Sequence, residues 1–119
     1  MRINADGTLR FTAISTTSSI ITDITTDSSI SASQWTRIAI VRNAGLASIF
    51  IEGIEQSITG TNDTTNYSND TSALNIGSML DVSANPYVGY IDEVRITVGQ
   101  ARYTSDYTLD TEEFPTQQC

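Results

Sequence analysis

The stretch that decides the fold is WTRIAIVR, residues 35–42. Side chains of a strand alternate between its two faces, so Ile38 and Ile40 point to one face. Trp35 and Val41 point to the other face. Both faces are largely apolar, which predicts a central strand in a two-layer structure.

A turn and a returning strand follow this stretch. Asn43-Ala44-Gly45 is typical of a tight turn. Residues 46–52 then alternate between apolar and polar side chains, which predicts an antiparallel partner strand. Glu52-Gly53 predicts a second tight turn. Residues 54–58 are expected to form a short strand after it.

Further strands are expected before this hairpin. Residues 8–14 alternate, and the Asp6-Gly7 turn signal ahead of them predicts a hairpin with residues 1–5. Residues 20–30 mix isoleucine with Thr, Ser and Asp, which predicts a solvated or edge strand.

The second half of the chain predicts two more strands, over residues 73–76 and 87–98, the latter with a bulge near Asp92. A tail follows from about residue 100. No segment of 12 residues shows a helical period, and 18 Thr and 15 Ile add β-branched side chains that suit strands. We therefore predict an all-β, two-layer antiparallel sandwich, with residues 1–119 as one domain. The predicted core residues are Trp35, Ile38, Ile40, Ile49, Ile51, Ile76, Ile91 and Val94.

Composition excludes several classes of function. The 119 residues include no His and no Lys, and the one Cys is Cys119. The missing histidine excludes Ser-His-Asp triads and histidine metal sites, and the missing lysine excludes a P-loop. A net charge of −8 makes nucleic acid and anionic membranes poor partners. No apolar run approaches the roughly 18 residues of a membrane span.

Sequence blocks in a characteristic order resemble a known family. They are WTRIAIVR at 35–42, IFIEG at 49–53, LNIG at 74–77, GYIDEVRIT at 89–97 and ARYT at 101–104. They resemble the concanavalin A-like (laminin G-like) jelly-roll domains. The ending, which closes on Phe114-Pro115, is similar to the copies found in bacteriophage structural and tail proteins. Glu52 stands where the family usually has Asn or Asp, residues that tolerate a positive φ better.

The family normally has further strands before the position of Asp6-Gly7, so the resemblance implies a sandwich that lacks its N-terminal strands. Such a sandwich leaves an apolar face and an unpaired edge uncovered. We therefore expect a homo-oligomer or a larger assembly, in which the partners are copies of this chain or other virion proteins.

Hydrolases of this fold, of the laminarinase type, place carboxylates at alternate positions of one strand as Glu-x-Asp-x-Glu. The chain has no such motif, and Asp92 and Glu93 are adjacent, so a regular strand would point them to opposite faces. We expect no enzymatic activity. Asp92 is expected to accept hydrogen bonds from backbone N–H groups, or from Arg95 or Arg102.

The strongest binding-site candidate is the polar stretch of residues 59–72, which is interpreted as a long loop. Amide, carboxylate and aromatic side chains there suit a glycan; they are Asn62, Asp63, Tyr67, Asn69 and Asp70. Asp63 and Asp70 are alternatively Ca²⁺ ligands, since hard cations prefer carboxylate oxygens. A plain solvated loop is the other interpretation. Trp35 is interpreted as a core anchor, with a sugar-stacking platform as the alternative.

These observations predict a non-catalytic structural or decoration protein of a bacteriophage virion, bound to the capsid or the tail. Host surface polysaccharide is a further expected partner. The alternative is a free-standing carbohydrate-binding or adhesion module at the cell surface or outside the cell. The expected location is accordingly the virion, or the extracellular space for the alternative.

Overall fold

A computed structural model describes residues 1–15, 19–68, 75–78 and 86–111. By their contacts the residues form two compact units. The first unit comprises residues 1–69 and 97–109, and the second comprises residues 70–96 and 110–119. Every strand that the structure describes belongs to the first unit. The structure describes no helix long and apolar enough to span a membrane.

One sheet of the first unit has four antiparallel strands in the order β1-β2-β3-β7. The strands are β1 (Arg2–Ile3), β2 (Thr8–Ile14), β3 (Ile20–Ser29) and β7 (Ile58–Asn62). Pairing of Arg2 with Arg10 and of Ile3 with Leu9 confirms the predicted first hairpin. The predicted place of β3 was wrong, because it lies between β2 and β7 and is no edge strand.

The second sheet has three strands in the order β4-β5-β6: β4 (Ile38–Asn43), β5 (Leu46–Ile51) and β6 (Ile54–Glu55). Two-residue turns connect them, as the sequence predicted. Ala44 and Gly45 form the first turn and Glu52 and Gly53 the second, all with positive φ. Glu52 tolerates its φ of 51° in a position where its side chain also accepts a hydrogen bond from the Arg37 N–H at 2.6 Å.

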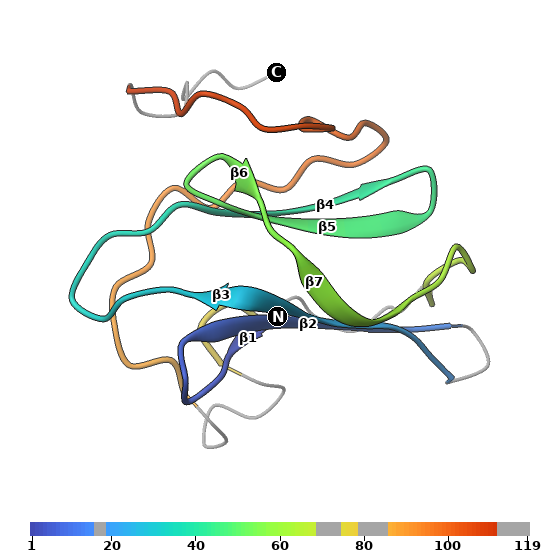
Figure 1. The fold of residues 1–119 in the computed structure, drawn as a ribbon, viewed down its shortest axis with the longest axis horizontal. Coiled ribbons are helices and arrows are strands. Elements are labelled where there is room, and N and C mark those ends of the chain that lie inside the picture. Colours follow the sequence, from blue (N-terminus) through green and yellow to red (C-terminus); the bar gives the residue numbers. More distant parts are fainter. Residues whose placement is uncertain (16–18, 69–74, 79–85, 112–119) are drawn as a thin grey trace. The chain divides into compact units, whose positions relative to one another are not determined.

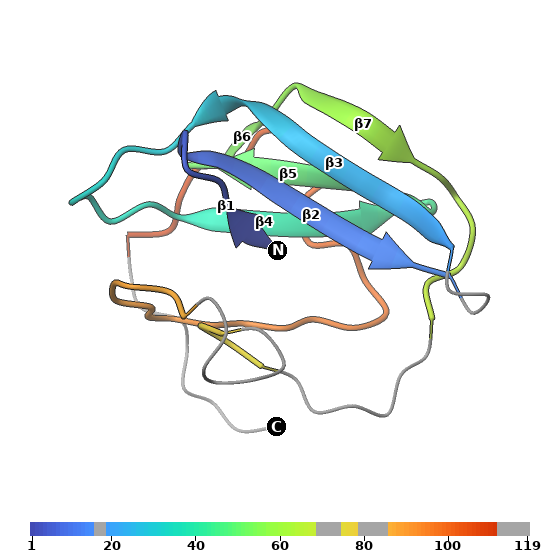
Figure 2. The same ribbon diagram turned by 90° about the horizontal axis from the view of Figure 1, so that it is seen from below.

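The two sheets face each other as a sandwich, with β2 and β3 against β4 and β5 (Figures 1 and 2). Leu9, Ile24, Ala47 and Ile49 form the buried cluster between them. Side chains two positions apart in a strand point to the same face, and these four lie on the face that is buried between the sheets. The same face of β3 also buries Thr22 and Thr26.

Buried threonine hydroxyls on β3 are satisfied within the protein. Thr26 Oγ1 accepts a hydrogen bond from the Leu9 N–H at 3.0 Å and donates to the Ser28 carbonyl at 2.6 Å. The Thr22 hydroxyl lies 3.1 Å from the Tyr67 hydroxyl, so both buried threonines have partners and avoid the cost of an unpartnered polar group. This is why a strand rich in Thr takes a buried position that its composition did not predict.

Residues 97–109 cover the outer face of the three-stranded sheet. Phe50 of β5 points outward and is almost fully buried, with the ring of Tyr107 at a centroid distance of 5.7 Å and that of Tyr103 at 6.2 Å. The two tyrosine rings stack at 3.6 Å. Tyr107 donates its N–H to the Gly53 carbonyl, and a Cβ on Gly53 would lie 2.2 Å from the Tyr107 carbonyl oxygen. The β5–β6 turn therefore fixes the covering segment.

The predicted core was right in part. Ile49 is fully buried, and Ile38, Ile40 and Ile51 are partly buried against the same cluster. The prediction was wrong for Trp35, which is 71% exposed, because β4 begins only at Ile38.

The prediction was also wrong for Ile76, Ile91 and Val94, which are all exposed. Residues 86–98 run without strand pairing, so the predicted strand over 87–98 is absent from the described residues. Of the predicted strand over 73–76, residues 75 and 76 are unpaired and the rest lies outside the described residues.

Candidate functional site

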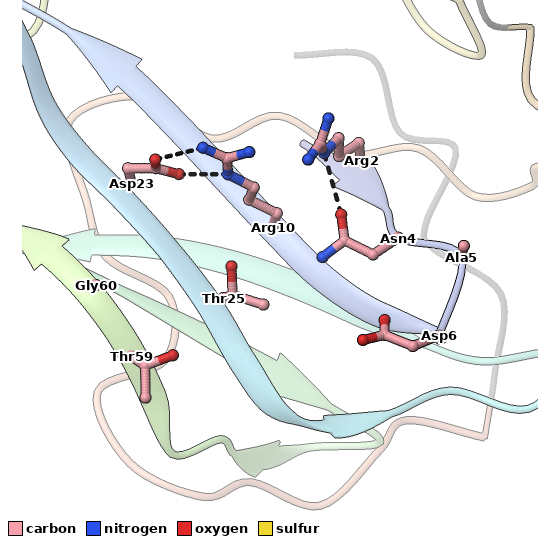
Figure 3. Close-up of a pocket in the computed structure, with 9 residues that line it drawn as sticks. All are labelled: Arg2, Asn4, Ala5, Asp6, Arg10, Asp23, Thr25, Thr59 and Gly60. Carbon is pink, nitrogen blue, oxygen red and sulfur yellow. Dashed lines mark hydrogen bonds and ion pairs between the residues drawn. The ribbon is translucent and has the colours of Figure 1, made fainter.

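The outer face of the four-stranded sheet carries an open hollow of about 520 Å³ (Figure 3). The residues that line it come from the first hairpin, from β3 and from β7. They are Arg2, Asn4, Ala5, Asp6, Arg10, Asp23, Thr25, Thr59 and Gly60.

Strand register brings these distant residues together. Arg10 pairs with Thr25, and Thr25 pairs with Thr59, so the three form a row across β2, β3 and β7. Thr12, Asp23 and Thr61 form the neighbouring row. Since adjacent core positions such as Leu9 and Ile24 point inward, these rows point outward.

An ion pair between Arg10 and Asp23 lines the hollow (Figure 3). Arg10 donates through Nε to Asp23 Oδ1 at 2.5 Å and through a terminal nitrogen to the other oxygen. Thr12 adds a hydroxyl hydrogen bond to Asp23 at 3.2 Å. The hydrogen bond from Arg10 holds the pKa of Asp23 below its usual value. The bidentate geometry fixes both side chains in place.

The first hairpin forms the rim of the hollow. Arg2 donates from Nε to Asn4 Oδ1 at 3.1 Å, and Asn4 donates to the Thr8 hydroxyl at 2.9 Å. Asp6 accepts from the Thr8 hydroxyl at 2.6 Å and from the Thr8 N–H at 3.0 Å, which lowers the pKa of Asp6. Both carboxylates of the hollow are therefore held in their ionised form.

The hydroxyls of Thr25 and Thr59 hydrogen-bond to no other described residue and point into the hollow (Figure 3). A threonine hydroxyl supplies one donor and two acceptor positions. The hollow thus combines two unused hydroxyls with a neutralised ion pair, an arrangement suited to a polar, uncharged ligand rich in hydroxyl groups. The sequence signal for this hollow was the polar residue at every second position of β2 and β3.

Three of the predicted glycan-binding residues, Asn62, Asp63 and Tyr67, lie within the described residues, and each makes contacts within the protein. Asn62 ends β7 and binds the other sheet: its Oδ1 accepts from the Ala47 N–H at 3.0 Å, and its Nδ2 donates to the Ala47 carbonyl at 2.8 Å. Residues 58–62 belong to β7, so the polar stretch is no loop at its start. The strand β6 pairs only with the end of β5, and the Asn62 amide hydrogen-bonds to the β5 backbone at Ala47, where β6 does not reach.

Tyr67 is also engaged within the protein. Its hydroxyl lies 3.1 Å from the Thr22 hydroxyl, and the Arg42 guanidinium lies 4.1 Å from the centre of its ring. Phe11 packs against the ring at a tilted angle, at 6.2 Å. Arg42 in turn donates to the carbonyls of Thr64 and Thr65. One face of Tyr67 is thus occupied by a cation–π contact.

Asp63 forms a local turn, accepting from the Thr65 N–H at 2.7 Å and the Thr65 hydroxyl at 2.6 Å. These hydrogen bonds lower the pKa of Asp63. Asn69 and Asp70 lie outside the described residues, so their predicted role stays a prediction. Across the described parts of the chain, no three acidic or cysteine side chains meet in a group that could hold a metal ion.

In the second unit, Asp92 accepts a hydrogen bond from the Glu93 N–H at 2.8 Å. This matches the predicted backbone role of Asp92. Glu93 has a φ of 50°, an irregularity beside the position where the sequence predicted a bulge.

Comparison with models of protein families matches residues 1–100 to the family described as the concanavalin A-like lectin/glucanases superfamily. The search of curated proteins found no match. The search of solved structures found none either.

Proposed function

The chain belongs to the concanavalin A-like lectin/glucanase superfamily, and on that premise we propose that it is a non-catalytic carbohydrate-binding or adhesion module. The observation that carries this proposal is the open polar hollow on the outer face of the four-stranded sheet. A sugar chain lies along the row of Arg10, Thr25 and Thr59, with its hydroxyls on the side chains of the two threonines.

The hollow is organised before any ligand binds. Arg10 and Asp23 already fix each other, so a sugar hydroxyl that bonds to either group does not have to order a free side chain. Ordering of flexible side chains is a major cost of binding, and a rigid strand surface avoids much of it. The shallow, open shape suits the middle of a polymer better than a small molecule that needs enclosure.

The carboxylates support the non-catalytic part of the proposal. A glycosidase needs one protonated carboxyl as general acid, usually through a raised pKa. Asp6 and Asp23 both have lowered pKa values, each because of a hydrogen bond from a neighbour. At neutral pH neither is in the form that donates a proton to a leaving group.

Binding to soluble polysaccharides in native affinity electrophoresis tests the proposal. Replacing both Thr25 and Thr59 by Val keeps the β-branched shape and removes the two hydroxyls. We expect roughly 30-fold weaker binding, since two lost hydrogen bonds at about 1 kcal/mol each make about 2 kcal/mol. Thr61→Val is the matched control, because Thr61 is exposed on the same strand but outside the lining of the hollow. Equal binding by the double variant contradicts this site, and release of reducing sugar contradicts the absence of catalysis.

A second candidate function is a structural or decoration module of a bacteriophage virion, with copies of this chain or other virion proteins as partners. One observation favours it: several large apolar side chains are exposed in the second unit, and exposed apolar surface can serve as a contact with another chain. They are Tyr87, Val88, Tyr90, Ile91, Val94, Ile96 within that unit, and Val98 next to it in sequence. Sedimentation of the purified full chain at micromolar concentration should then show an oligomer. A folded monomer with a sharp thermal transition contradicts this candidate.

A further inference from the structure

Two tyrosine rings lie face to face in the segment that covers the three-stranded sheet. The ring centroids of Tyr103 and Tyr107 are 3.6 Å apart, and the two ring planes differ by 7°. Carbon atoms in contact rest at about 3.5–4.0 Å from each other. Nearly all of the 3.6 Å is therefore the separation of the two planes, and the rings overlap with little sideways offset. Ring carbons of one tyrosine thus face ring carbons of the other at contact distance.

The surroundings of the pair hold this arrangement. Aromatic rings prefer offset or edge-to-face packing, because the negative faces of two stacked rings repel each other. Phe50 packs against both tyrosines at steep interplanar angles of 57° and 61°. Tyr107 donates its N–H to the Gly53 carbonyl at 2.9 Å. The neighbouring Asp106 carboxylate accepts a hydrogen bond from the Glu55 N–H at 2.8 Å, so side-chain packing and backbone contacts together keep the rings stacked.

Face-to-face contact is the geometry in which two tyrosyl radicals couple. One-electron oxidation of a phenol removes an electron and a proton, and the unpaired electron then occupies a π orbital that extends to the carbons beside the hydroxyl. This orbital is perpendicular to the ring plane, so stacked rings bring two such orbitals into end-on overlap. Holding two reactants in this way converts a collision into a step within one molecule.

Both rings are within reach of a small oxidant. Tyr103 and Tyr107 are partly exposed, and residues 104–106 between them are exposed. Burial raises the pKa of the Tyr107 hydroxyl, so this phenol is protonated at neutral pH and loses a proton when it is oxidised. The partial exposure lets water take that proton, and it leaves room for the rings to turn once they are joined.

We infer that Tyr103 and Tyr107 are a site of oxidative cross-linking, at which hydrogen peroxide acting through a haem peroxidase joins the two rings as dityrosine. Each phenol loses one electron and one proton, and a carbon–carbon bond forms between two ring carbons that stand next to the hydroxyls. The hydrogen on each of these carbons then moves to the phenol oxygen, which restores both aromatic rings. Two tyrosines and one hydrogen peroxide give one dityrosine and two waters. The bond closes residues 103–107 into a ring beside Phe50, and it does not depend on the proposed carbohydrate binding.

Peptide mass spectrometry of the full chain tests this inference after treatment with hydrogen peroxide and a haem peroxidase, with the Cys119 thiol alkylated beforehand. Trypsin cleaves after Arg102, and the peptide of residues 103–119 contains Tyr103 and Tyr107 and no other tyrosine. We expect this peptide to lose two hydrogen atoms. Breaks between the two tyrosines should then give no separate fragment ions, and the peptide should show the fluorescence of dityrosine.

Four variants test which groups react and whether their packing matters. Tyr103→Phe keeps a stacked ring but removes one phenol, so it should abolish the mass change. Tyr87→Phe, at an exposed tyrosine of the second unit, should react like the native protein. Gly53→Ala should slow the reaction roughly fivefold, because its Cβ would collide with the Tyr107 carbonyl oxygen and displace the ring. Gly99→Ala, with nothing within 4 Å of its Cβ, should react at the native rate.

The outcomes distinguish a folded site from chance coupling. A rate that does not depend on protein concentration, and that falls when the chain is unfolded in urea, supports the inference. An unchanged mass for the peptide of residues 103–119 in the oxidised native protein overturns it, and so does dityrosine that appears only between two chains. Equal rates for the native protein and the chain in urea also overturn it, because nearness in sequence would then be sufficient for the bond.

Discussion

Asn62 offers the sharpest test of how the two sheets are held together. Its amide forms two hydrogen bonds with the backbone of Ala47, at 3.0 and 2.8 Å, and Ala47 is only 1% exposed. Replacing Asn62 with Ala leaves a buried N–H and a buried carbonyl without these partners. Each such group costs about 1–3 kcal/mol.

The two groups together give an expected loss of about 2–6 kcal/mol in the free energy of unfolding, the lower end applying if water enters beside Ala47. That is a large fraction of the ~5–15 kcal/mol that stabilises an ordinary domain. Urea unfolding followed by far-ultraviolet circular dichroism measures it, with an unchanged slope showing that the loss is one of stability.

Asn66→Ala is the matched control, because Asn66 is exposed in the same polar stretch. It should lie within about 0.5 kcal/mol of the native protein. If Asn62→Ala and Asn66→Ala unfold at the same urea concentration, the amide does not connect the sheets and the reasoning fails.

Three further changes test the core, the covering segment and the ion pair. Ile49→Ala should lower the free energy of unfolding by ~2–5 kcal/mol, because Ile49 is fully buried. Ile54→Ala, at an exposed position, should change that free energy little. Equal urea midpoints for the two variants contradict the core assignment. Gly53→Ala should release residues 103–107 and weaken the tyrosine near-ultraviolet dichroism, since the new Cβ would collide with the Tyr107 carbonyl oxygen. Gly99 also has a positive φ but nothing within 4 Å of a Cβ, so Gly99→Ala should preserve that signal. Asp23 has a folded-state pKa below its unfolded value, so its contribution to stability is present above the unfolded pKa and is lost as the pH falls through the folded pKa. The urea midpoint of Asp23→Asn should therefore fall less between pH 6 and pH 3 than that of the native protein, and identical pH profiles would argue against the ion pair.

The alternation of apolar and polar residues predicted those strands in which every second side chain is apolar. Residues 8–14 and 46–51 appear as β2 and β5 for this reason, and the Gly-containing turns appear where the sequence placed them. The pattern did not predict β7, because this strand has few apolar residues: its inward phase is Ile58, Gly60 and Asn62, and an amide replaces a hydrophobic contact. Local polarity therefore indicated a loop where long-range hydrogen bonds form a strand.

Trp35 was mispredicted for a related reason. Alternation assigns a side to a residue only while the strand continues, and β4 begins three residues later. The hollow could not be predicted either, since Arg10, Thr25 and Thr59 are neighbours through strand register. The register is set by how β3 pairs with β2 on one side and with β7 on the other. Those pairings cannot be inferred from a single sequence.

The outer faces of the two sheets differ in what they require, and this decides which one is available to a ligand. An apolar residue that points outward needs a cover, and Phe50 receives one from Tyr103 and Tyr107. The outward rows around Arg10 and Asp23 are polar and remain stable in water, so no segment has to cover them. Loss of the cover in Gly53→Ala should therefore promote association through the exposed phenylalanine while the hollow keeps its polysaccharide affinity. Loss of the hydroxyls in the variant with Val at positions 25 and 59 should do the reverse. If the two variants instead fail in the same assay, the two faces are not independent and the assignment of binding to the four-stranded sheet is wrong.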